Sequence, residues 1–391
     1  MRYVVERRDV PSFPANSHFH RSITAAFALI LTACLPIAAQ AQTGTLAFRS
    51  GYGPATNLAA PGDCWSAPKG SGCWQKIQGT DSTTGFTWPP YIWGGPGSYG
   101  WPSGKPYGNG GVFQLIGEAP ADVTPATVAD YLFKQIVNML QPIGTRTNRA
   151  LYMQVTKARN GRDPMGTGST QDQFQLFPGN QQTDLYISYW VRFQAGMTKN
   201  MIGLASGPGI YDNGGTWRAF FAFKTGTIPS TAGDIPPDNG DYRVEAYVQT
   251  GCHPDMTAQQ IPPCTGPNPN PAPFWVIAGD NNAGGGFSPV NTWVETNTTV
   301  PVPDEGQWSK VEIFWHRSSG PDGRVWMAIN GSKIADHIGP NTGAAQLPIN
   351  RIMVNSLHSG GRLPIYQWVD DIQIWTGGFP TVMDDPPYAP H

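Results

Sequence analysis

The sequence predicts an all-β protein built as a two-sheet antiparallel sandwich of the jelly-roll type, with long loops and one short helix. Several segments alternate apolar and polar side chains with a period of two, as strands do when one face lies in a core. The 391 residues include 47 glycines and 38 prolines, which is typical of short strands joined by turn-rich loops. Asn330-Gly331 is the favoured two-residue hairpin turn and joins two such segments.

Residues 1–41 are expected to be a secretory signal that is not part of the fold. A polar, arginine-containing region precedes the apolar run Ile23–Leu35, and Ala39-Gln40-Ala41 forms a small-residue cleavage site. The apolar run is too short to span a bilayer. Leu31-Thr32-Ala33-Cys34 also resembles a bacterial lipobox. We therefore expect a secreted or periplasmic bacterial protein, with an outer-membrane lipoprotein anchored at Cys34 as the alternative.

The remainder is expected to form one domain and to be monomeric. Residues 42–112, rich in Gly, Pro and Trp, are expected to wrap the β-sandwich, which occupies residues 113–380, and residues 381–391 form a C-terminal tail. Residues 124–140 have helical spacing of apolar side chains and provide the one expected helix. Residues 250–291 lose periodicity and are interpreted as loops.

Four cysteines follow the signal segment as two close pairs. We expect the disulfides Cys64–Cys73 and Cys252–Cys264, because export places the chain in an oxidising compartment. A zinc site is the alternative, but it requires the two pairs to converge, and their spacings match no zinc finger.

The charge of the chain limits its partners. The net charge is −2 and charged residues make up 13% of the sequence. This composition argues against nucleic acid and against an anionic membrane surface. After the signal segment, no apolar run is long enough to act as a membrane span.

The strand signals begin after the predicted helix. They cover residues 151–156, 185–194, 218–224, 242–249, 308–317, 324–329, 332–337 and 366–375. The order of these strands in the sheets does not follow from the sequence.

Residues 185–194 are the most informative segment. One face is apolar and consists of Leu185, Ile187, Tyr189, Val191 and Phe193. The opposite face consists of Tyr186, Ser188, Trp190, Arg192 and Gln194. Flat rings beside planar hydrogen-bonding groups suit a pyranose, which has an apolar C–H face and a polar rim. The second face therefore predicts a glycan-binding groove.

Three further segments show a family resemblance, together with Asp184–Phe193. They are Gly306-Gln307-Trp308, Asp322–Gly331 and Val369–Trp375. In these segments the chain resembles the concanavalin-A-like jelly-roll group of carbohydrate-active proteins, and it is most similar to secreted polysaccharide lyases of the glucuronan-lyase and heparinase type. The resemblance implies cleavage of an acidic, uronate-containing polysaccharide by β-elimination on a concave sheet face. The alternatives are a non-catalytic, lectin-like glycan-binding protein and a structural protein of the envelope or matrix.

Two motifs of related enzymes are missing. The chain has no Glu-x-Asp-x-x-Glu strand, which retaining glucanases of this group need to place two carboxylates about 5 Å apart. Arg243-Val244-Glu245 echoes one alginate-lyase motif, but the accompanying Gln-Ile-His and Tyr-x-Lys motifs are absent.

The predicted catalytic groups are expected to share one concave sheet face. They are Arg192 or Arg243 to neutralise the substrate carboxylate, His316 as base, and Tyr247 as acid or as both acid and base. The predicted substrate-binding residues are Tyr186, Trp190, Lys224, Arg218, Glu245 and Glu312. Alternatively, His316 is a strand histidine that is hydrogen-bonded to a neighbour, and Arg243 and Glu245 form a plain ion-pair ladder. His253 and His358 are weaker candidates.

The chemistry requires no cofactor. The family resemblance implies a structural calcium held by Asp370 and Asp371, with backbone carbonyls from the N-terminal segment. The alternative is that one of these residues faces solvent and the other caps a turn.

Overall fold

A computed structural model describes the strand-bearing parts of the chain. The described residues are 44–58, 74–88, 112–116, 136–142, 149–155, 171–176, 182–197, 216–227, 240–250, 273–281, 290–303, 306–358 and 365–380. All of them belong to one unit, Thr43–His391. Among these residues, no helix is long and apolar enough to cross a membrane.

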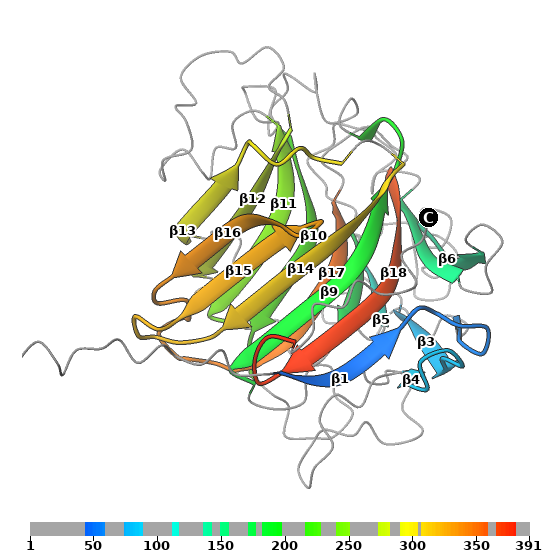
Figure 1. Ribbon diagram of the computed structural model, residues 1–391, viewed down its shortest axis with the longest axis horizontal. Helices are drawn as coiled ribbons and strands as arrows, with labels where there is room; N and C mark the ends of the chain where they lie inside the picture. Colours follow the sequence, from blue (N-terminus) through cyan, green and yellow to red (C-terminus); the bar gives the residue numbers. More distant parts are fainter. Residues whose placement is uncertain are drawn as a thin grey trace, which may run out of the picture. The chain divides into compact units, whose positions relative to one another are not determined.

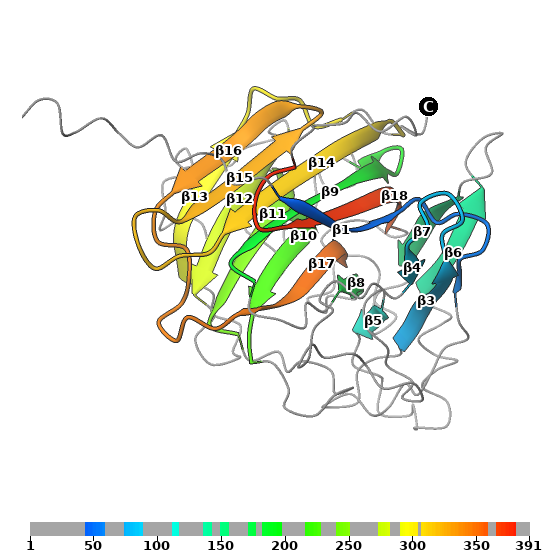
Figure 2. The ribbon, with the colours of Figure 1, turned by 60° about the horizontal axis from the view of Figure 1, so that its bottom comes forward.

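The strands form two antiparallel sheets that pack face to face (Figures 1 and 2). The first sheet has the order β16 (Ser332–Ile338), β15 (Arg324–Ile329), β14 (Trp308–His316), β9 (Asp184–Phe193), β18 (Ile365–Thr376), β7 (Arg149–Val155) and β6 (Ile136–Pro142), and β1 (Thr45–Ser50) also pairs with β18. The long strand β18 holds β7 along its first half and β1 along its second half.

The second sheet lies behind the first in Figure 1. Its order is β13 (Val290–Asn297), β12 (Phe274–Asn281), β11 (Tyr242–Thr250), β10 (Thr216–Thr225), β17 (Ile349–His358), β8 (Gln171–Leu176), β5 (Val112–Ile116), β3 (Trp74–Thr80) and β2 (Asn57–Leu58), and β4 (Thr87–Trp88) pairs with β3. The predicted sandwich of antiparallel sheets is therefore confirmed.

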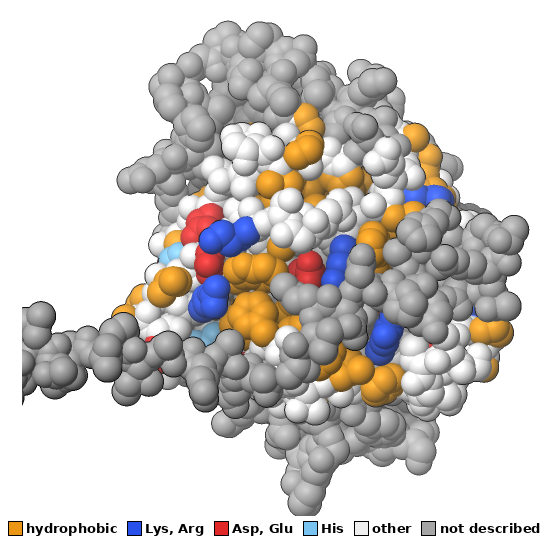
Figure 3. All heavy atoms as spheres, viewed as in Figure 1, with side chains coloured by type: hydrophobic (Ala, Val, Ile, Leu, Met, Phe, Trp, Pro, Cys, Tyr) orange, Lys and Arg blue, Asp and Glu red, His pale blue; other side chains and the backbone are white. Residues whose placement is uncertain are grey.

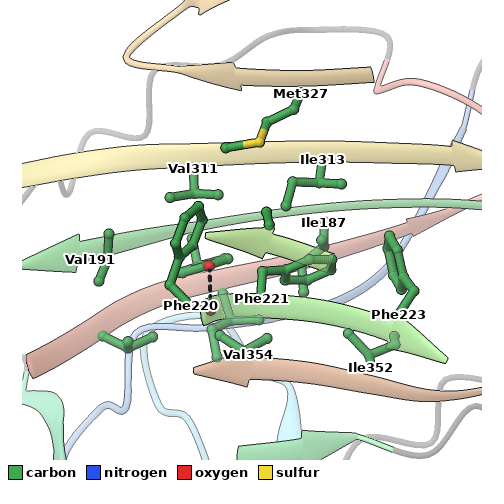
Figure 4. Packing of buried hydrophobic residues seen from close by; sticks show 14 of the residues in the cluster. Ile187, Val191, Phe220, Phe221, Phe223, Val311, Ile313, Met327, Ile352 and Val354 are labelled. Carbon is green, nitrogen blue, oxygen red and sulfur yellow. Dashed lines mark hydrogen bonds between the residues drawn. The ribbon is translucent and has the colours of Figure 1, made fainter. Parts of the chain in front are cut away.

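The core lies between the inner faces of the two sheets. Figure 4 shows side chains of β9 and β14, among them Ile187, Val191 and Ile313, facing Phe221 of β10 and Val354 of β17. These side chains are fully buried. The Tyr189 hydroxyl reaches across the core and donates a hydrogen bond to the Phe220 carbonyl at 3.1 Å. The one polar group on the inner face of β9, a strand described in full, therefore has a hydrogen-bond partner.

A bulge explains the aromatic density of the core around β10. The register between β10 and β11 shifts between Ala219 and Phe221. A bulge interrupts the strict alternation of a strand, and as a result Phe220 and Phe221 are both buried in the same core. Phe220 contacts Trp275 edge-on, with ring centroids 5.6 Å apart.

The eight strands predicted from alternation are all present, and so is the hairpin turn. Asn330 and Gly331 both have positive φ, at 50° and 74°, as a type I′ turn requires.

The helix predicted for residues 124–140 is wrong over its last turn. Ile136–Pro142 form strand β6, which pairs antiparallel with β7. The apolar spacing there suits either structure, and pairing with β7 decides between them because tertiary partners override local propensity. Residues 124–135 lie outside the described part of the chain.

Two regions for which no strand was predicted also contain strands. Residues 42–112 contribute β1 to β4 and the start of β5, and residues 250–291 contain β12. Strand β12 is buried on both faces between Trp275 and Asp280, so it lacks the polar alternation that identifies a half-exposed strand.

The core predicts a sharp contrast between two isoleucines of the first sheet. Replacing fully buried Ile187 by Ala should lower the free energy of unfolding by about 2–5 kcal/mol, because apolar contacts are lost and the surrounding core fills the cavity only in part. Ile338→Ala is the matched control, since Ile338 is 67% exposed, and its effect should stay within about 0.5 kcal/mol. Urea unfolding measures both variants, and equal losses would contradict this description of the core.

Candidate functional site on the second sheet

The sandwich separates the predicted site residues into two groups. Arg192 and His316 belong to β9 and β14 of the first sheet, whereas Arg243 and Tyr247 belong to β11 of the second sheet. The inner faces of both sheets fill the core, so the polar faces of β9 and β11 point away from each other. The prediction that these residues share one sheet face is therefore wrong.

Charged residues of four neighbouring strands line up on the outer face of the second sheet. We call this set the charged row, and it consists of Arg351 on β17, Lys224 on β10, Arg243 on β11 and Asp280 on β12. Along β11, Glu245 comes next and is flanked by the small residues Ala222 and Ala278. Tyr247 follows on the same face. Residues two apart on a strand are about 7 Å apart, so the row, Glu245 and Tyr247 form one compact cluster.

Arg243 is the centre of this cluster. Its guanidinium donates from Nε and Nη2 to Asp280 Oδ2, at 2.9 and 2.6 Å. Its Nη2 also lies 3.2 Å from Glu245 Oε2. The ion pair between Arg243 and Glu245 that the sequence offered as an alternative is thus present.

Burial sets the protonation behaviour of the cluster. Burial raises the pKa of Glu245 more than the charges of Arg243 and Lys224 lower it. For Arg243, burial disfavours the charged form, but the Glu245 and Asp280 carboxylates outweigh it and raise the pKa. Glu245 therefore holds its proton more readily than an ordinary glutamate, while Arg243 stays charged.

Asp280 has one carboxylate oxygen without a partner. Its Oδ2 accepts both bonds from Arg243, whereas its Oδ1 is buried and has no hydrogen-bond partner within the described part of the chain. Buried carboxylate oxygens are nearly always hydrogen-bonded. This atom is therefore the point in the cluster that offers an acceptor to a ligand hydroxyl or to water.

Two residues of the cluster, Arg351 and Asp280, were not predicted from the sequence. Arg351 and Met353 alternate with the core residues Ile352 and Val354, so the period of two along β17 would have revealed them. Asp280 had no such signal, because its strand is buried on both faces.

Tyr186 and Glu312 lie on the outer face of the first sheet but are buried there. The Tyr186 hydroxyl donates to Glu312 Oε1 at 2.7 Å. The ring of Phe379 lies 6.1 Å from that of Tyr186 and 4.2 Å from that of Phe314. The predicted groove is thus closed at this end by the segment that follows β18.

His316 forms the hydrogen bond that its non-catalytic interpretation predicts. Its Nδ1 lies 2.8 Å from Asp184 Oδ1 and its Nε2 3.6 Å from Asp322 Oδ2. It sits at the last position of β14, near Arg324 at the start of β15. Its place on the first sheet separates it from Tyr247, so the two do not form the predicted base and acid pair.

Trp190 and Arg192 are half-buried on the outer face of the first sheet. Figure 3 views this face and shows basic side chains beside apolar ones. Arg218 lies on β10, opposite Val248 of β11, but the structure does not describe its side chain, nor that of His358.

Asp370 and Asp371 do not offer the donors that a calcium ion needs. The Asp371 carboxylate is bound by the Arg49 guanidinium at 3.0 and 3.3 Å. Asp370 Oδ1 accepts the Asp371 amide hydrogen at 2.7 Å. Arg49 of the N-terminal segment thus places a cation on the Asp371 carboxylate, and a carboxylate bound in this way does not fit a calcium ion. Among the described residues, no three His, Cys, Asp or Glu side chains gather as metal ligands.

Several predictions fall on residues outside the described ranges. They concern the signal segment, Cys34, His253 and the cysteines Cys64, Cys73, Cys252 and Cys264. The two disulfides therefore stay predictions.

No protein-family model matches the sequence, and no curated protein matches it. Solved structures match by fold. The alginate lyase Aly36B is 16% identical over 64% of this chain and 90% of its own, with a TM-score of 0.33. The endo-β-1,4-glucuronan lyase of the fungus Trichoderma reesei is 13% identical over 62% and 87%, with a TM-score of 0.36. The binding domain of botulinum neurotoxin serotype G is 10% identical over 62% and 42%, with a TM-score of 0.29. At these values the likeness supplies no argument about activity.

The pKa of Glu245 predicts a pH-dependent difference between the wild type and Glu245→Gln. Because burial raises the folded-state pKa, the contribution of Glu245 to stability is fully present below its unfolded pKa of about 4.3 and is lost as pH rises through the folded value. Glu245→Gln should therefore gain stability relative to the wild type as the pH rises from about 4.3 through the raised folded-state pKa. Urea unfolding at several pH values measures this difference.

Asp322→Asn provides a control of opposite sign. The hydrogen bond from Ser318 lowers the pKa of the exposed Asp322 carboxyl. The contribution of the Asp322 carboxylate to stability is therefore present above its unfolded-state pKa and is lost as the pH falls through its folded-state pKa. The wild type should lose its advantage over Asp322→Asn as the solution is acidified, and the same trend for both variants would contradict the assignment for Glu245.

Proposed function

We propose that the protein is a secreted polysaccharide lyase that binds an acidic, uronate-containing glycan on the outer face of the second sheet and cleaves it by β-elimination. The observation that carries this proposal is the charged row with Glu245 and Tyr247 beside it. Secretion rests on the sequence of residues 1–41, and the glycan class rests on the charge of the cluster.

The charge balance of the cluster favours an anionic ligand. Among the described residues of the cluster, Arg351, Lys224 and Arg243 contribute three positive charges, against the two carboxylates of Asp280 and Glu245. The excess of one positive charge grows to two when Glu245 is protonated, which its raised pKa favours. In a site shielded from water such an excess acts strongly on a carboxylate.

The elimination needs three groups, and the cluster supplies a candidate for each. A cation neutralises the uronate carboxylate so that the C5 proton becomes acidic, and Lys224 and Arg351, which lie beside Arg243 in the row, are the candidates. Glu245, in its ionised form, is the candidate base that removes the C5 proton. The C4–O bond breaks as the C4–C5 double bond forms, and the Tyr247 hydroxyl protonates the leaving oxygen.

This assignment differs from the one made on sequence. Tyr247 keeps its predicted role as acid, and Arg243 holds the two carboxylates in place. Glu245 replaces His316 as base, because His316 is on the other sheet. Arg192 is on the other sheet as well and takes no part in this site.

One observation favours a non-catalytic alternative. Glu245 is only 9% exposed and Tyr247 only 3%, so a glycan reaches them only if their surroundings open. A protein in which the row only stabilises the sheet needs no such opening. One that holds a glycan along the row without cleaving it does need it, because Arg351 is only 4% exposed and Asp280 only 2%.

Two substitutions test the lyase proposal. Tyr247→Phe and Lys224→Gln should each lower kcat/KM on a uronate polymer by about 10²- to 10⁴-fold, because each removes a group used in the transition state. The ultraviolet absorbance of the unsaturated product, recorded across a panel of uronate polymers, measures the rate.

Tyr186→Phe is the matched control for Tyr247→Phe. Tyr186 is equally buried but lies on the other sheet, bonded to Glu312, so its loss should leave kcat/KM unchanged. Equal activity of Tyr247→Phe and the wild type, with both folded, would exclude the assigned acid. The absence of product from every polymer, with binding still measurable, would favour the non-catalytic alternative.

A further inference from the structure

A second row crosses the first sheet on its outer face, on the opposite side of the sandwich from the charged row. We call it the aromatic row, and it consists of Trp308 on β14, Arg192 on β9, Trp368 on β18 and Tyr152 on β7. These residues are direct cross-strand neighbours. Their chain neighbours Val191, Val369 and Leu151 are buried in the core, so the row faces outward.

The side chains of this row stack on one another. The Arg192 guanidinium carbon lies 3.9 Å from the centre of the Trp368 ring and 5.4 Å from that of Trp308. The rings of Trp368 and Tyr152 are 5.2 Å apart, and Tyr366 packs against both. A hydrogen bond of 2.8 Å from Trp368 Nε1 to Gln141 Oε1 fixes the central ring.

Arg192 has no carboxylate partner among the described residues. Its Nε is buried there without a hydrogen bond, and burial lowers its pKa. The other arginines of the first-sheet strands are satisfied: Arg49 and Arg324 pair with carboxylates, and Arg149 donates to backbone carbonyls. A partly desolvated guanidinium without a counter-ion attracts an anion, and its flat donor set suits a carboxylate.

The aromatic row is accessible. Its four residues and Tyr366 are all half-buried, neither packed into the core nor fully exposed, and Met139 beside Tyr152 is 38% exposed. Three strand spacings set the length of the row at about 14 Å, which accommodates a short oligosaccharide. Half-exposed rings stack well on the C–H face of a pyranose.

We propose that the aromatic row is a second binding site for an acidic polysaccharide, distinct from the site on the second sheet. Trp308, Trp368 and Tyr152 stack against the sugar rings, and Arg192 binds the carboxylate of a uronate residue. The site holds the polymer without cleaving it, because the row contains no carboxyl or imidazole group to act as a base, and burial raises the pKa of Tyr152 so that its hydroxyl stays protonated. It does not depend on whether the second sheet cleaves the polymer.

Titration calorimetry with a uronate hexasaccharide tests this site in the full-length secreted chain. The titrations use a Tyr247→Phe background so that the probe is not consumed. Arg192→Gln and Trp368→Ala should each weaken binding about tenfold or more, because one removes the charged hydrogen bonds and the other a stacking ring. Hydrogen exchange with the hexasaccharide bound should slow in residues 187–193, 306–312 and 365–369.

Three controls make the outcome decisive. Arg317→Gln removes a charge outside the row, where Arg317 donates to the Gln346 carbonyl, and should not change the affinity. Arg192→Lys keeps the charge but loses the flat donor set, and should bind more weakly than the background protein while keeping its melting temperature. Cellohexaose, an uncharged probe of similar length, should bind at least about tenfold more weakly than the uronate.

Unchanged affinity in Arg192→Gln and Trp368→Ala would overturn the proposal, as would equal affinity for cellohexaose or for a single-stranded oligonucleotide. Protection confined to β10 and β11 would also overturn it. Failure of the lyase proposal has a different signature: the wild type would yield no unsaturated product, while binding to the aromatic row would be retained.

Discussion

The burial of one face of every central strand between the two sheets is the constraint on which the rest of the structure depends. Ile187, Val191 and Phe221 are fully buried in that layer, and the Tyr189 hydroxyl bonds across it. Because alternate side chains of a strand point in opposite directions, whatever does not enter the core faces outward. The two outer faces are separated by the thickness of a sandwich, about 10 Å between backbones, so they act as independent surfaces.

The two surfaces differ in a way that suits different tasks. The outer face of the second sheet gathers shielded charges, and in Glu245 a carboxyl whose pKa burial raises. The first sheet presents half-exposed rings around a guanidinium. If both proposals hold, the outer face of the second sheet carries out proton transfer and the outer face of the first sheet holds the polymer.

The half-buried strands and the hairpin turn were predictable from the sequence, because a strand with one buried face alternates apolar and polar residues with a period of two. Strand β12 could not be predicted, because it is buried on both faces and therefore lacks the period of two. The segment 136–140 could not be assigned either, because its apolar spacing suits a helix and a strand alike. The grouping of Arg243, Glu245 and Tyr247 on one face followed from their spacing. The spacing could not show that His316 lies on the other sheet. Sheet membership depends on pairings such as those of β9 with β14 and β18, which join residues more than 100 positions apart in sequence and leave no local signal.

The most direct test of the central claim is mass spectrometry of the products that the wild-type protein releases from uronate polymers. Elimination removes a proton and a leaving oxygen without adding water, so the new non-reducing ends should carry an unsaturated uronate, one water lighter than a hydrolysis product. Saturated ends, or no cleavage of any polymer that the protein binds, would contradict the account.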